Sequence, residues 1–87
     1  MSKTIIEKER LEKLNNLEQE IIDSVINLRK KSRQTQQEIA DKSGVIRETV
    51  ARIENRITSP QVNTLLKILE TYGYTIKITK IKKEKLN

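Results

Sequence analysis

The chain has 87 residues, which is enough for one small domain with a thin core, so self-association is expected. Eighteen Lys and Arg residues against 12 Asp and Glu give a formal net charge of +6, which favours a polyanionic partner. The absence of Cys and His excludes disulfides, imidazole bases, thiol nucleophiles and the usual zinc sites. We therefore predict a protein that is not an enzyme and holds no metal or cofactor.

Hydropathy and aromatic content narrow the class of partner further. The first residues lack the apolar stretch of a secretion signal, and no apolar run approaches the roughly 20 residues of a membrane span. The chain is therefore expected to be cytoplasmic, with no membrane partner. Proteins that bind single-stranded nucleic acid stack bases on several aromatic rings, whereas this chain has two Tyr and no Phe or Trp. Duplex DNA is the better prediction.

Residues 1–20 form a nearly neutral segment with 4 basic and 5 acidic side chains. Apolar residues recur here and beyond at spacings of three and four, the stripe of an amphipathic helix: Leu11, Leu14, Leu17, Ile21, Val25 and Leu28. Asn15 and Asn16 interrupt the pattern, because Asn is poor in a helix interior and good at a cap. Either one helix runs to about Lys31, or a break at the two Asn residues separates off a short arm.

Two short helices are predicted next. The residues from Thr35 to Glu38 have the sequence of a capping box, so a helix begins at Gln36. It should end near Gly44, which adopts the left-handed backbone of a helix terminus without a Cβ clash. A second helix is expected from about 46 to 54, with apolar residues on one side and Arg, Glu and Thr on the other. The alternative interpretation is that this polar side only contacts solvent and has no binding role.

Ser59 and Pro60 predict the start of a fourth helix, with Ser as the N-cap and Pro in the first turn, ending at Gly73. The following residues alternate between apolar and polar, which predicts a strand over 74–79. A lone strand leaves its backbone groups unpaired, so we expect it to pair with its own copy in an antiparallel ribbon. The dimerisation residues are then Tyr74, Ile76 and Ile78, and the Lys-rich segment 80–87 is expected to be frayed.

Residues 28–73 resemble the Cro/CI-type (XRE-type) helix-turn-helix family. The resemblance is carried, in this order, by Arg29, Thr35-Gln36, Glu38-Ile39-Ala40, Gly44-Val45, Ile53-Glu54-Asn55, Pro60 and the stretch from Leu65 to Gly73. It implies a mainly α fold, a lambda-repressor-like bundle of four to five helices, to which the dimerising strand is added. The predicted organisation is a helical extension (1–20), the DNA-binding domain (21–73), and a strand with a basic tail (74–87).

The resemblance also implies roles for single residues. The second helix of the motif enters the major groove, and its base-reading residues are Arg47, Glu48, Thr49 and Arg52. The expected phosphate contacts are Gln36, Gln37, Arg33, Asn55 and Arg56. Arg29 and Glu54 are expected to form a buried structural ion pair. Three positions depart from the family pattern: Ile46 replaces a small hydroxyl residue, Arg33-Gln34 replaces Gly-Leu, and Arg56 replaces Gly.

The GYTIKI ending and the Leu-striped extension look like the small HigA-type or HipB-like antitoxins. Such proteins repress their own operon as dimers and bind a co-encoded toxin. The resemblance therefore predicts a palindromic operator and a toxin partner, with Leu11, Leu14 and Leu17 either contacting the toxin or packing on their own domain. The alternatives are a stand-alone XRE-type repressor and an interaction module whose basic surface is incidental.

Overall fold

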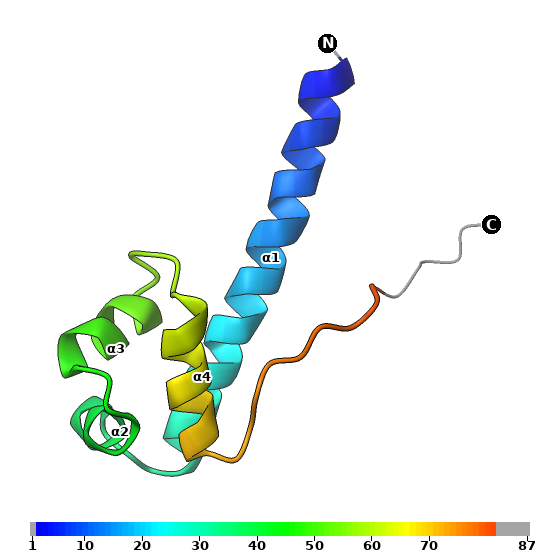
Figure 1. Ribbon diagram of the computed structural model, residues 1–87. Coiled ribbons are helices and arrows are strands. Elements are labelled where there is room, and N and C mark those ends of the chain that lie inside the picture. Colours follow the sequence, from blue (N-terminus) through cyan, green and yellow to red (C-terminus); the bar gives the residue numbers. More distant parts are fainter. Residues whose placement is uncertain (1, 82–87) are drawn as a thin grey trace.

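The computed structural model of the chain describes residues 2–81, which form four α-helices. They are α1 (Ser2–Lys31), α2 (Gln36–Ser43), α3 (Arg47–Glu54) and α4 (Val62–Thr71). The second half of α1 packs with the three shorter helices, while its first half projects out of the bundle (Figure 1). The predicted mainly α bundle is confirmed. None of the helices within residues 2–81 is both long and apolar enough to span a bilayer.

The first helix is continuous through Asn15 and Asn16, so the break that the sequence left open does not occur. The Glu, Lys and Leu residues on both sides are strong helix formers, and they outweigh two unfavourable Asn residues. Every residue from Ile5 to Leu17 is exposed, and we call residues 5–17 the arm. The alternative in which this extension packs on its own domain is therefore wrong.

The short helix α2 begins and ends as predicted. The amide of Glu38 donates to Thr35 Oγ1 at 3.0 Å, and the amide of Thr35 donates to Glu38 Oε1 at 2.8 Å, which completes the capping box. Gly44 has φ +80° and donates its N–H to the carbonyl of Ala40 at 2.9 Å. Helix α3 follows after Ile46, whose extended backbone carries no side-chain cap because an apolar side chain has no acceptor to offer.

Helix α4 begins at Val62, two residues later than Pro60, so the predicted N-cap at Ser59 is wrong. Gln61 occupies the N-cap position with an extended backbone, and Pro60 stays in the loop from α3. The local start signal is overridden because tertiary packing places the helix, which buries three side chains in the core: Leu65, Ile68 and Leu69.

Three helices end in the same hydrogen-bonding pattern. After α1, α3 and α4, the residues with positive φ are Arg33 (+57°), Arg56 (+59°) and Gly73 (+85°). In each case the next amide donates to the carbonyl five residues earlier, at 3.2, 3.1 and 2.9 Å respectively. This pattern favours glycine, because a side chain at positive φ crowds the backbone at a cost of about 1 kcal/mol. The two Arg departures from the family pattern therefore both lie at left-handed positions.

Replacing Arg33 with glycine is expected to raise the free energy of unfolding by about 1 kcal/mol, because the left-handed backbone then carries no side chain. Arg56→Gly is the matched variant. It relieves the same backbone strain but removes the hydrogen bonds that Arg56 makes to Asp23 and Gln19 of α1, so its stability should change little. Urea unfolding of the three proteins measures the difference. Equal stabilisation by both substitutions would show that the contacts to α1 contribute nothing.

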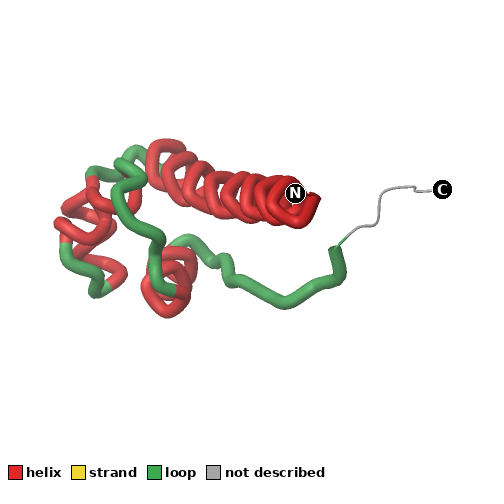
Figure 2. The backbone as a smooth tube through the Cα atoms, turned by 90° about the horizontal axis from the view of Figure 1, so that it is seen from above, coloured by secondary structure: helices red, strands yellow, loops and turns green. Residues whose placement is uncertain are grey.

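The core is small and lies where α1–α4 meet. It is made of ten buried residues: Ile22, Val25, Ile39, Ala40, Val45, Val50, Ile53, Leu65, Ile68 and Leu69. After Gly73 the chain leaves the bundle on the side toward which the arm projects (Figures 1 and 2). Residues 2–81 contain no strand, so the predicted strand 74–79 is not formed by one chain alone. Most of the predicted frayed tail, residues 82–87, lies outside the described residues.

Candidate nucleic-acid interface

Helices α2 and α3 are joined by a tight turn at Gly44, Val45 and Ile46. Val45 is buried in that turn, and Val50 and Ile53 fix the inner side of α3 to the core. The angle between the two helices is therefore set by apolar packing at the corner and along α3. This packing leaves the opposite side of α3 facing outward.

The outer side of α3 carries the four predicted base-reading residues. Arg47, Glu48 and Arg52 are exposed, and Thr49 is half-buried. Within residues 2–81, no hydrogen bond or ion pair engages the guanidinium of Arg47 or of Arg52, and Glu48 does not pair with Arg52. An α-helix with its side chains is about 10–12 Å across, which matches the roughly 12 Å width of the major groove of B-DNA.

Arg29 of α1 and Glu54 of α3 form a bidentate ion pair. Nε donates to Oε2 at 2.7 Å and Nη2 donates to Oε1 at 2.8 Å, with the two side chains only 14% and 7% exposed. Gln36 at the start of α2 donates from Nε2 to the same carboxylate at 3.0 Å. The carboxylate of Glu54 therefore joins α1, α2 and α3 at one point.

The same network extends to the end of α4. Arg29 Nη1 donates to the backbone carbonyl of Gln34 at 2.9 Å, and the hydroxyl of Tyr72 donates to Gln34 Oε1 at 2.9 Å. Burial raises the pKa of Tyr72 above its ordinary value, so the phenol stays protonated and remains a donor. The network holds the orientation of α3 relative to the three other helices.

The predicted phosphate-binding residues have different environments. The side chain of Gln36 is hydrogen-bonded to Glu54. The group of Gln36 that can bind a phosphate is therefore its backbone N–H at the start of α2. Gln37 donates to Asp41 Oδ1 at 2.8 Å on an exposed surface. Arg33 and Asn55 are exposed at the ends of α1 and α3. Arg56 binds Asp23 and Gln19 of α1, so it must leave these partners to reach a phosphate.

Comparison with known proteins identifies the family. The model of the helix-turn-helix family matches residues 25–78. The chain belongs to the helix-turn-helix family. This helix-turn-helix protein is also 35% identical over 68 residues to an uncharacterized HTH-type transcriptional regulator of Haemophilus influenzae, over 78% of this chain and 69% of the relative. No solved structure matches it.

A polar hollow of about 400 Å³ beside α3 is not predicted from the sequence. It lies between α3 and the loop to α4, and its polar lining comes from Thr49, Arg52, Thr58, Ser59, Gln61 and Thr64. The sequence signal for this hollow is the three hydroxyl or amide side chains around Pro60: Thr58, Ser59 and Gln61. Ser59 and Pro60 predict a helix start, but in the structure Thr58, Ser59 and Gln61 extend the polar surface of this helix-turn-helix beyond α3.

The ion pair gives the stability of the helix-turn-helix a defined pH dependence. Burial acts to raise the pKa of Glu54, but the hydrogen bonds from Arg29 and Gln36 and the charges of Arg29 and Lys30 outweigh it, so its pKa lies below the ordinary value. A carboxylate with a lowered folded-state pKa stabilises fully above its unfolded value, about 4.3, and loses this contribution as the pH falls through the folded value.

We therefore expect the stability gap between the wild type and Glu54→Gln to be constant from pH 7 to about pH 5 and to narrow below about pH 4. The measurement is urea unfolding at several pH values for both proteins. Glu48→Gln is the control, because Glu48 is exposed on the same helix and makes no ion pair with Arg52. A gap that stays constant down to pH 3 would contradict a lowered pKa of Glu54.

Proposed function

We propose that this protein is a sequence-specific regulator of transcription that binds duplex DNA with α3 in the major groove. The observation that carries the proposal is the pair of exposed side chains, Arg47 and Arg52, on the outer side of a helix whose inner side is anchored in the core. Membership of the helix-turn-helix family supports it, as does the relative named as an HTH-type transcriptional regulator.

Each outer side chain of α3 suits a particular base edge. An Arg guanidinium makes two hydrogen bonds, to O6 and N7 of guanine. We therefore assign one guanine to Arg47 and one to Arg52. The methyl group of Thr49 suits the C5-methyl of thymine, and the carboxylate of Glu48 accepts from the amino group of cytosine. Because Glu48 does not pair with Arg52 in the free protein, it is available for that contact.

The backbone contacts come from the ends of the helices that flank α3. The amides of Gln36 and Gln37 lie in the first turn of α2, where the helix dipole favours a phosphate. Arg33 and Asn55 add an exposed cation and an exposed amide. These groups set the position of the protein on the duplex, whereas the side chains of α3 supply the sequence preference.

Salt dependence tests phosphate binding directly. Neutralised phosphates release counterions, so the logarithm of the association constant should fall linearly with the logarithm of salt concentration, by roughly 0.9 per phosphate. Fluorescence anisotropy with a labelled duplex between 50 and 300 mM salt, about the range over which screening matters, gives the slope. Arg33→Ala should reduce the slope by about 1 per bound protomer. A flat response would favour the interaction module with an incidental basic surface.

We further propose that the protein binds DNA as a homodimer whose two chains pair residues 74–79 in an antiparallel ribbon. Tyr74, Ile76 and Ile78 are all exposed in the single chain, although they are large and apolar. An unpaired segment with this alternation gains backbone hydrogen bonds and apolar burial from a second copy. Selection of bound duplexes from a random pool should then return a palindrome, whereas a single asymmetric site would contradict the dimer.

An antitoxin role is a second candidate function, because the arm carries exposed Leu11, Leu14 and Leu17 at helical spacing. Such a stripe on a helix outside the core is suited to a protein partner. If the role holds, a neighbouring gene should be toxic when expressed alone and tolerated when this chain is co-expressed. If both neighbours are harmless when expressed alone, the protein is a stand-alone repressor.

A further inference from the structure

The arm presents an apolar stripe that its own domain leaves uncovered. Leu11, Leu14, Leu17 and Ile21 are 60%, 51%, 51% and 37% exposed, and they lie within one side of α1. The arm, about 20 Å long, gains no stability from tertiary packing within its own chain, although packing of an apolar face is the main source of helix stability in proteins. We therefore expect the stripe to pack against a second molecule.

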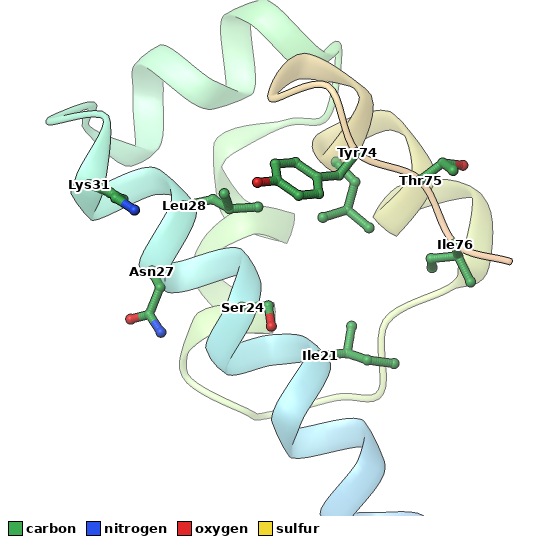
Figure 3. Close-up of a pocket in the computed structure, with 9 residues that line it drawn as sticks. Ile21, Ser24, Asn27, Leu28, Lys31, Tyr74, Thr75 and Ile76 are labelled. Atoms are coloured by element: carbon green, nitrogen blue, oxygen red, sulfur yellow. The ribbon is translucent and has the colours of Figure 1, made fainter. Parts of the chain in front are cut away.

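A groove of about 460 Å³ continues this stripe toward the bundle (Figure 3). Ile21, Ser24 and Leu28 of α1 line one wall, and Tyr74 and Ile76 line the other. Figure 3 shows Leu28 and Tyr74 facing each other across the groove, and Ile21 near Ile76 at its open end. Ile21 belongs to both the stripe and the groove, so the two form one continuous apolar surface.

We propose that the arm of a second copy of this chain fills the groove, and that the arm of the first copy fills the groove of the second, in an antiparallel pair of α1 helices. The two-fold axis passes close to Ile21. This inference rests on the proposed dimer and adds to it the location of the axis and a role for the arm.

The position of the axis follows from the residue shared by the two surfaces. In an antiparallel pair, residues equally far before and after the axis lie opposite one another. With Ile21 on the axis, Leu14, seven residues before it, lies opposite the partner's Leu28, seven residues after it. The stripe of one arm thus reaches the groove of the other chain, and each contact occurs twice.

Charge favours a second copy in this antiparallel direction. Residues 5–20 hold five acidic and three basic side chains, whereas the last turn of α1 is basic and ends in the exposed Lys30 and Lys31. A parallel pair would instead set each acidic residue beside its own copy and leave both grooves open.

The same axis accommodates the proposed ribbon. Ile76 lies near Ile21 at the groove, and it is close to the centre of segment 74–79. An axis that passes near Ile21 therefore also passes near the middle of the paired segments. One two-fold interface then contains both the helices and the ribbon, which a partner unrelated to this chain would not provide.

Cysteine cross-linking tests the axis, because the natural chain contains no Cys. Ile21→Cys should form an inter-chain disulfide under mild oxidation, since equivalent residues at the axis come within reach of each other. Asn16→Cys, an exposed position on the opposite side of the same helix, is the control and should stay monomeric on a non-reducing gel. A mixture of Leu14→Cys and Leu28→Cys proteins should give the mixed dimer.

The other outcomes overturn the proposal in distinguishable ways. Self-linking of Leu14→Cys without linking of Ile21→Cys would place the axis elsewhere, and equal linking of Asn16→Cys would mean random collision. A dimer by light scattering without the Ile21→Cys disulfide leaves the ribbon dimer intact and refutes the arm exchange. A monomer at micromolar concentration refutes both dimer proposals. Whether the protein binds duplex DNA at all is tested separately, by the salt dependence of its association constant.

A double variant tests whether the arm contributes to association. Leu14→Asp with Leu17→Asp should weaken dimerisation at least tenfold in sedimentation equilibrium, while the thermal unfolding of the bundle at high dilution stays unchanged, because both residues lie outside the core. Glu9→Gln with Asn16→Gln is the matched control on the opposite side of the arm. Unchanged dimerisation of the Asp variant, or capture of only a different protein by the wild-type arm, would overturn the proposal.

Discussion

Glu54→Ala is expected to lower the free energy of unfolding by about 3 kcal/mol or more. Removal of one partner of a shielded ion pair leaves the other charge without compensation, at a cost of roughly 3 to 5 kcal/mol. Here the remaining group is Arg29, which loses both bidentate bonds, and Gln36 loses its acceptor as well. Small domains have total stabilities of about 5 kcal/mol or slightly more, so most of the margin disappears.

Urea unfolding followed by circular dichroism measures this loss. Glu48→Ala is the matched control, because it removes the same charge from an exposed position of the same helix and should change stability by less than about 0.5 kcal/mol. The destabilised protein should also lose DNA affinity in proportion to its unfolded fraction. A cost below about 1 kcal/mol for Glu54→Ala would show that the network does not hold α3 in place.

Arg47→Ala is expected to remove discrimination at one base pair in each half-site, a loss of roughly 1 to 3 kcal/mol, or about 5- to 150-fold in relative affinity. The physical reason is the bidentate guanine contact that only an Arg at the start of α3 provides in the proposed complex. Stability should not change, because the side chain is exposed and lies outside the core.

The measurement compares binding of the wild type and Arg47→Ala to the selected duplex and to its single-base variants. Arg33→Ala is the control, since a phosphate contact weakens binding on all sequences alike and leaves the preferences intact. A uniform loss for Arg47→Ala would reassign Arg47 to the phosphate backbone. An unchanged affinity for every duplex would remove α3 from the major groove and contradict the proposed function.

Local interactions explain which predictions from sequence succeeded. The capping box at Thr35 and Glu38 needs only residues three apart, and the left-handed Gly44 needs only its own backbone. The apolar spacing in α3 and α4 likewise identified their buried sides. The fold class and the order of the helices followed from these signals, because each is formed within one or two helical turns and does not depend on distant packing.

The start of α4 and the course of α1 show where local signals are insufficient. Ser59 and Pro60 favour a helix start, but the burial of Leu65 in the core places the first turn later. Asn15 and Asn16 favour a break, but the surrounding helix formers carry the helix through. In both cases the summed energy of many residues exceeds that of one local preference.

The sequence by itself determined the helix-turn-helix corner and the polar composition of α3, since capping, glycine backbone freedom and helical periodicity are properties of neighbouring residues. Only the tertiary structure decided that Arg56 turns to Asp23, that Tyr72 and Gln34 extend the network of Glu54, and that Leu14 stays outside the core. These outcomes depend on distances between residues far apart in the chain, which the packing of the four helices sets.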